Sequence, residues 1–202
     1  MPTTASDELI PLTDQDDLWS SCFMVAPLVI IGSRDAAGEQ NFAPKHMAMP
    51  LSWDRYFGFV CTPAHTTYGN ILASGQFTVT FPWADQVLMA SLSAAPRGKD
   101  DTKPSLAALP TRPAEHVEGA FLEQGYLFLE CELHRMVEGF GENSLVAGKV
   151  VAAQVHRRAL RVSDEDDQDI LQRSPLLAYV QPGRFAEISQ ALSFPFPSGF
   201  KK

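Results

Sequence analysis

The chain has 202 residues, of which 45% are hydrophobic and 20% charged, an ordinary composition for one globular domain. Its formal net charge of −8 argues against a nucleic acid or an acidic membrane as partner, because the field of the protein repels phosphate groups. The cysteines Cys22, Cys61 and Cys131 form no Cys-x-x-Cys pair, so we expect reduced thiols. No apolar run approaches the roughly 20 residues of a membrane span, and residues 1–8 do not resemble a signal peptide, so we expect a cytoplasmic protein.

The first part of the chain predicts an arm and two strands. Residues 1–20 are expected to form an N-terminal arm, followed by a single domain over residues 21–202. The segment 23–33 is an almost continuous apolar run, which predicts a buried strand. Residues 41–49 then read as the returning strand. Pro44 cannot donate a ladder hydrogen bond, so this strand needs an edge position or an irregularity there.

The next elements are a strand, a short helix and a second strand. Residues 56–62 predict a strand, and residues 63–75 predict a loop and a helix that ends at a glycine. The segment 76–82 alternates phenylalanine and valine with Thr78 and Thr80. This alternation predicts a half-exposed strand with the two threonines on its outer face.

The second half of the domain begins with a predicted helix over residues 83–95. Residues 96–125 follow, rich in proline and charge, and predict either a long excursion over the active face or a mobile lid. Two alternating runs, 126–138 and 144–156, predict a long hairpin. An acidic segment then predicts a short helix capped by Ser163.

The order of these elements favours a mainly antiparallel β fold with a few helices. Strands do not alternate regularly with helices, which disfavours a doubly wound parallel sheet. A closed or split barrel would also protect the edge strands.

Common catalytic motifs are missing from the sequence. We find no glycine-rich nucleotide-binding motif, no nucleophile elbow and no zinc-protease signature, and the five histidines have no metal-ligand spacing. Catalysis by a single recognisable acid–base motif is therefore not indicated.

Two segments carry side chains that could bind a phosphorylated cofactor. Thr66, Thr67 and Asn70 cluster at a predicted helix start, where backbone N–H groups favour an anion. The alternative is that one threonine is only the helix cap. Asn41, Lys45 and His46 would face this helix start from the strand 41–49, and together the two segments would surround a phosphate and a flat polar ring. The alternative has Lys45 and His46 in solvent on an edge strand, and the residues alone do not separate these interpretations.

At this point the sequence resembles the flavin reductase-like, FMN-binding split-barrel family. The resemblance spans roughly residues 24–190 and rests on four stretches in family order: "PLVIIGSRDAAGEQNFAP", "TTYGNILASGQFTVTFP", "LECEL…GKVVAAQVH" and "PLLAYVQPGRFAEI". Two departures stand out. The family often has a serine shortly after the Ala-Pro step, where this chain has Lys45-His46-Met47, and often has Asp-Pro-Pro where this chain has residues 53–56.

The resemblance implies a six-stranded antiparallel Greek-key split barrel with a few flanking helices, which forms a homodimer with FMN near the subunit interface. FAD is the alternative flavin, and NAD(P)H is the implied electron donor. Arg184 and Phe185 match a C-terminal element of the family. The residues predicted to bind the cofactor are Asn41, Ala43, Pro44, Lys45, His46, Thr66, Thr67, Asn70, Gly148 and Lys149. Lys45 and His46 would replace the family's hydroxyl as phosphate donors, and Gly148 and Lys149 would approach the flavin from the hairpin strand, within one chain or across the dimer.

The resemblance therefore predicts an FMN-dependent oxidoreductase that takes hydride from NAD(P)H and reduces a small-molecule acceptor or releases reduced flavin. Two other functions stay open at this point. One is an FMN carrier or sensor without NAD(P)H turnover. The other is a β-barrel interaction protein without a cofactor.

Overall fold

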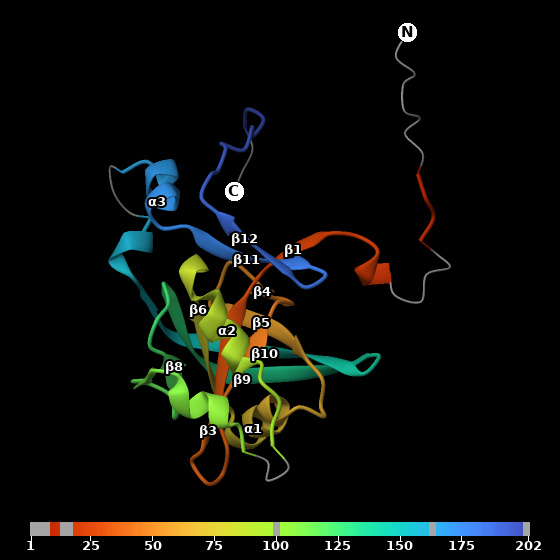
Figure 1. Cartoon of the computed structure of the whole chain (residues 1–202), viewed down its shortest axis with the longest axis vertical. Helices are drawn as coiled ribbons and strands as arrows, with labels where there is room; N and C mark the ends of the chain where they lie inside the picture. The colour runs from red at the N-terminus through yellow and green to blue at the C-terminus, as the bar shows by residue number, and fades with distance from the viewer. Residues whose placement is uncertain (1–8, 13–17, 99–101, 162–164, 200–202) are drawn as a thin grey trace.

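The computed structural model describes residues 9–12, 18–98, 102–161 and 165–199 (Figure 1). Its main feature is one curled antiparallel sheet of seven strands. Their spatial order is β3 (Gln40–Lys45), β2 (Val29–Arg34), β6 (Gln76–Phe81), β9 (Leu127–Phe140), β10 (Asn143–Val155), β5 (Tyr56–Cys61) and β4 (Ala48–Pro50). The two end strands, β3 and β4, are separated by only two residues in the chain, so the sheet must curl to bring its ends together. The predicted mainly β split barrel is confirmed.

The number of strands differs from the expected six because one predicted strand is broken. The run 41–49 forms β3 and β4 with a turn at residues 46–47 between them. Pro44 pairs with Ile30 of β2 and has no strand on its other side, because β3 is the last strand of the sheet. This edge position suits a proline, which has no N–H to donate to a further strand.

A second, three-stranded sheet lies beside the barrel, in the order β1 (Met24–Pro27), β11 (Leu176–Gln181) and β12 (Arg184–Ile188). The single strand predicted over 23–33 is therefore wrong. It divides at Leu28, so that β1 pairs with β11 while β2 enters the main sheet. Arg184 and Phe185 lie exposed on β12.

The helices are short. They are α1 (Thr66–Ser74), α2 (Val87–Ser93) and α3 (Asp167–Arg173), with 3-10 turns at Leu18–Ser20, Ala84–Gln86, Pro104–Ala108 and Arg157–Ala159. Gly75 ends α1 in the left-handed conformation, with φ of 70°, as predicted. The cap of α3 is Asp166, whose side chain accepts the Gln168 N–H, so the predicted cap is wrong; Ser163 itself lies outside the described residues. Among the described residues, no helix is long and apolar enough to cross a membrane.

Strand β6 is buried on both faces rather than half exposed. The Thr78 and Thr80 side chains are buried, and Thr78 Oγ1 donates to the Ala120 carbonyl at 2.6 Å. The covering element is β8 (Ala120–Leu122), which pairs with β7 (Thr111–Pro113) in a small sheet within the 96–125 excursion. The alternation in β6 could not reveal this, because the cover comes from a segment far along the chain.

A buried carboxylate fastens this excursion to the barrel. Glu130 on β9 is 1% exposed, and its Oε2 accepts the backbone N–H groups of Glu115, His116 and Val117 at 3.1, 2.5 and 3.0 Å. Three donors on one carboxylate oxygen make a strong, charge-assisted contact. Of the two alternatives for residues 96–125, the described part supports an excursion that is packed onto the sheet.

We predict that Glu130→Ala lowers the free energy of unfolding by about 3 kcal/mol, because three backbone donors lose a charged acceptor at a buried position. Chemical denaturation of the variant beside wild type measures this loss. Glu132→Ala, at an exposed position of the same strand, is the matched control and should change the free energy of unfolding by no more than about 0.5 kcal/mol. Equal effects of the two substitutions would show that Glu130 does not anchor the excursion.

Candidate functional site: a cation-lined cavity between strand β3 and helix α1

Strand β3 and helix α1 meet through a buried group of polar side chains. Asn41 Nδ2 donates to Thr67 Oγ1 at 3.0 Å and lies 3.5 Å from Ser33 Oγ, which also accepts from Asn70 Nδ2 at 3.3 Å. Asn41 is 4% exposed and Thr67 is 2% exposed. The expected approach of the asparagine-bearing strand to the threonine-rich helix start is confirmed.

The start of α1 has no side-chain cap. His65 occupies the N-cap position, and its side chain makes no cap hydrogen bond. Thr66 and Thr67 are the first two residues of the helix, so the alternative that one of them serves only as the cap is wrong. The peptide N–H groups of a helix start carry partial positive charge and favour a bound anion.

A cavity of about 350 Å³ opens at this helix start. Strand β3 and α1 form one side of it, and the end of α2 with the beginning of the excursion forms the other. Six of the predicted cofactor residues line it: Asn41, Ala43, Pro44, Lys45, Thr66 and Thr67. The lining also includes His65, residues 93–97 and Lys103.

Three basic side chains converge on the cavity. Lys103 Nζ donates to the carbonyl oxygens of Phe42, at 3.0 Å, and of Ser93, and so fastens the excursion to β3 and to the end of α2. Burial lowers the pKa of Lys103, and the charges of Arg97 and Lys45 lower it further. Positive charge is thus concentrated at this cavity in a chain whose net charge is −8.

Lys45 also affects His65, the N-cap residue. Lys45 Nζ lies 3.5 Å from His65 Nδ1. Burial lowers the pKa of His65 from its ordinary value of 6.5, and the Lys45 charge lowers it further. His65 is therefore a neutral hydrogen-bonding group at pH 7, and the positive charge comes from Lys45, Arg97 and Lys103.

Four of the ten predicted cofactor residues lie outside this cavity within one chain: His46, Asn70, Gly148 and Lys149. His46 stacks on the Tyr179 ring, with centroids 4.4 Å apart, and burial lowers the pKa of this histidine. Gly148 is a packing residue: a Cβ there would lie 2.4 Å from Phe77 Cζ. Lys149 is exposed on β10. A contact of Gly148 or Lys149 with a flavin across a dimer stays a prediction.

Sequence analysis missed two of the basic residues, Arg97 and Lys103. Both lie in the excursion 96–125, whose lack of periodicity gave no indication of which side chains turn toward the barrel. The sequence indicates a role for these two residues only through their positive charge, within a long proline-rich segment for which a path over the active face is one of two predictions. Among the described residues, no group of three histidine, cysteine or acidic side chains is placed to hold a metal ion.

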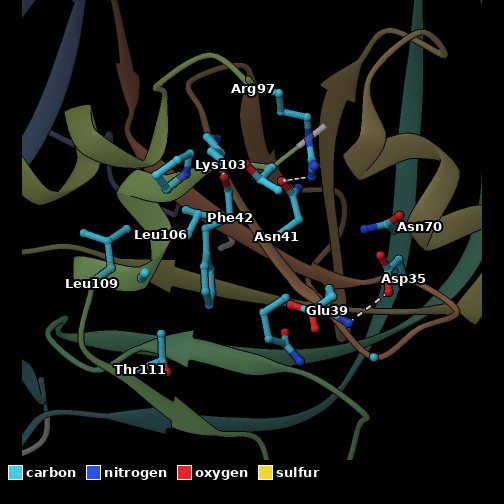
Figure 2. Close-up of a pocket in the computed structure, with 15 residues that line it drawn as sticks. Asp35, Glu39, Asn41, Phe42, Asn70, Arg97, Lys103, Leu106, Leu109 and Thr111 are labelled. Carbon is cyan, nitrogen blue, oxygen red and sulfur yellow. Dashed lines mark hydrogen bonds between the residues drawn. The ribbon is translucent and has the colours of Figure 1, made fainter. Parts of the chain in front are cut away.

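A second cavity of about 700 Å³ adjoins the first (Figure 2). Asn41, Arg97 and Lys103 line both cavities. Arg97 Nη2 donates to Asn41 Oδ1 at 3.0 Å, and this contact lies at the boundary between them. Asn70, predicted as a cofactor residue, lines the second cavity rather than the first.

The fold is that of a split barrel, and the sequence assigns it to a family. Residues 20–187 match the family described as the flavin reductase like domain, and the chain belongs to this family.

Solved structures share the fold at low sequence identity. Flavoredoxin from Methanosarcina acetivorans superposes with a TM-score of 0.74 at 16% identity, over 95% of this chain and 97% of that one. The FMN-binding protein from Thermus thermophilus with bound p-hydroxybenzaldehyde gives 0.69 at 22% identity, over 85% and 91%. The NADH:FAD oxidoreductase of Streptomyces globisporus C-1027 gives 0.69 at 16% identity, over 89% and 96%.

Proposed function

We propose that this protein is an FMN-binding oxidoreductase that takes electrons from NAD(P)H and passes them to a small-molecule acceptor or to free flavin. The observation that carries the proposal is the cavity at the start of α1, where Lys45, Arg97 and Lys103 converge beside a helix start without a side-chain cap. A flavin mononucleotide is a phosphate dianion attached to a flat, polar ring, and this cavity has a complementary end for each part.

The phosphate end would lie at α1. The helix N-terminus offers N–H groups and partial positive charge, and the Thr66 hydroxyl and Lys45 ammonium line the same space. An anion there would also favour the charged form of Lys103, whose pKa is lowered by burial and further by the charges of Arg97 and Lys45. The residues present therefore fit the phosphate group.

The ring end would lie along β3. Because β3 is an edge strand, one side of its backbone has no strand partner and can form hydrogen bonds with the polar edge of a flat ring. Ala43 and Pro44 line the cavity and leave room beside that edge. When bound, the flavin supplies the redox chemistry by accepting the hydride that leaves C4 of the dihydronicotinamide. The protein's part is to bind, orient and exclude water.

Two of the similar structures agree with this proposal in what their names state. One is an FMN-binding protein and another an NADH:FAD oxidoreductase. Neither identity exceeds 22%, so these names support the reaction class and do not identify the acceptor.

We further propose a homodimer that forms through the β4 edge. Met47, Met49 and Leu51 are exposed around this terminal strand, and Trp53 is fully exposed just after it. Large apolar side chains grouped at an unpaired sheet edge are typical of an interface. A partner docked there could bring its own Gly148 or Lys149 toward the flavin.

The first test is spectroscopic. Protein purified with FMN should be yellow, and anaerobic addition of NADH or NADPH should bleach the flavin absorbance. Protein that stays colourless and takes up no FMN would overturn the binding site. Yellow protein that neither donor bleaches would favour the alternative, a flavin carrier or sensor.

The second test concerns the phosphate end. Lys45→Met keeps most of the side-chain stem and removes the charge, so we expect FMN to bind about tenfold to a hundredfold more weakly, from the loss of one charged contact. Fluorescence titration with FMN measures the Kd. Arg135→Met removes one positive charge at an exposed position of β9 and should leave the Kd unchanged. Equal affinities of wild type and Lys45→Met would place the phosphate elsewhere.

The third test concerns the dimer. Light scattering after gel filtration should give wild type a mass of twice the 22.2 kDa chain. Trp53→Asp places a charge in the apolar interface and should shift the protein toward the monomer. A monomeric wild type, or a Trp53→Asp variant as dimeric as wild type, would contradict an interface at the β4 edge.

A further inference from the structure

The second cavity is large enough for a substrate of its own. Its volume of about 700 Å³ falls within the roughly 300–1,000 Å³ of pockets that hold cofactor-sized molecules. Its lining comes from the turn between β2 and β3, from strand β3, and from Arg97 and residues 102–111 of the excursion, with Asn70 added by α1 (Figure 2).

The boundary with the smaller cavity is positively charged. Arg97 and Lys103 line both spaces, and the hydrogen bond from Arg97 to Asn41 Oδ1 holds the guanidinium at the junction. Guanidinium and ammonium groups at a junction of this kind suit the phosphates of a ligand that extends through both spaces.

One wall of the larger cavity is apolar. Pro104, Leu106 and Ala107 come from the 3-10 turn of the excursion, and Leu109 and Phe42 continue the same wall. A flat heteroaromatic ring can pack on such a wall at low desolvation cost.

The opposite side carries two carboxylates. Asp35 and Glu39 belong to the β2–β3 turn and are exposed at the cavity. Asp35 Oδ1 accepts the N–H groups of Ala37 and Glu39, each at 2.9 Å, which fixes the shape of the turn. Carboxylates accept hydrogen bonds from sugar hydroxyls and repel a phosphate.

The basic residue nearest in sequence does not offset these charges within the cavity. Arg34 Nε donates to the Gly38 carbonyl at 2.9 Å, and its Nη1 lies 3.5 Å from Glu118 Oε2. Arg34 is not part of the lining, so the turn presents negative charge to the cavity.

We propose that the larger cavity binds the adenosine diphosphate part of the electron donor, and that Asp35 and Glu39 make the protein selective for NADH over NADPH. The adenine packs on the apolar wall, the pyrophosphate lies by Arg97 and Lys103, and the ribose hydroxyls face the two carboxylates. NADPH carries a 2′-phosphate at that ribose, which the carboxylates repel. This inference rests on the proposed function, because the nicotinamide end must reach a flavin in the smaller cavity.

Direct binding tests the inference without catalysis. NAD⁺ and NADP⁺ cannot reduce the flavin, so calorimetric titration of the oxidised, FMN-loaded protein measures affinity alone. We expect wild type to bind NAD⁺ more tightly than NADP⁺. Glu39→Lys should shift the ratio of the two Kd values toward NADP⁺ by about tenfold, because a repulsive contact becomes attractive. Glu39 is preferred to Asp35 for this change because Asp35 also shapes the turn.

Three further variants complete the design. Glu39→Gln removes the charge with little change of shape and should shift the ratio in the same direction by a smaller factor. Glu142→Lys makes the same change of net charge at the exposed turn of the β9–β10 hairpin and should leave the ratio unchanged. Ala107→Trp fills the larger cavity from a residue that does not line the smaller one, and should weaken both nucleotides without changing the Kd of FMN.

The outcomes separate this inference from the proposed function. If both nucleotides bind equally, if NADP⁺ binds more tightly, or if neither binds, the inference is overturned, while bleaching of the flavin by either donor would still support the proposed function. If Ala107→Trp weakens FMN binding, the larger cavity holds part of the flavin and the inference is again overturned. If no donor bleaches the FMN-loaded protein, both proposals fail together.

Discussion

The candidate site depends on the side-chain amide of Asn41, which joins three segments that are distant in the sequence. Its Nδ2 donates to Thr67 at the start of α1, and its Oδ1 accepts from Arg97 in the excursion, both at 3.0 Å. A carboxamide donates through its nitrogen and accepts through its oxygen, both without charge. Because Asn41 is almost fully buried, losing either partner leaves a polar group unpaired, at a cost of roughly 1–3 kcal/mol. The strand, the helix and the cavity wall are therefore positioned together.

The distribution of charge around Asn41 differs from that of the rest of the chain. A chain with a net charge of −8 has no general reason to gather Lys45, Arg97 and Lys103 around one space. Burial lowers the pKa of Lys103, and the charges of Arg97 and Lys45 lower it further, so the charged ammonium is held there at a cost. A bound anion offsets that cost. Packing alone would be satisfied by apolar side chains of similar size, so the concentrated charge supports the anion site that we propose.

Local patterns in the sequence predict most of the helices and strands. They do not predict which distant segments cover or pair with each strand. The hairpin of β9 and β10 and the helix that ends at Gly75 follow from alternation and from a glycine at a helix end, and both are present. The burial of Thr78 does not follow from its own strand, because the covering segment lies about forty residues further along the chain. The division of the 23–33 run also depends on a distant partner, β11.

The residues of the candidate site are likewise only partly predictable from local sequence patterns. Asn41 and Thr67 were identified because each belongs to a segment that resembles the flavin reductase-like family, and the resemblance, more than the residue types, indicated that they would meet. Arg97 and Lys103 lie in a segment without periodicity, where sequence gives no direction for any side chain. Glu130 was likewise visible only as one residue of an alternating strand, although its carboxylate fastens the excursion that carries both cations.

Lys45 and His46, where this chain departs from the family, lie in two different environments. Side chains alternate between the faces of a strand, so Asn41, Ala43 and Lys45 belong to one face of β3, and all three line the smaller cavity. His46 follows the last residue of β3 and turns to Tyr179 of the neighbouring sheet. Only Lys45 is thus placed to substitute for the hydroxyl that the family often carries nearby. An ammonium in place of a neutral hydroxyl adds positive charge to this cavity, to which the excursion also contributes Arg97 and Lys103.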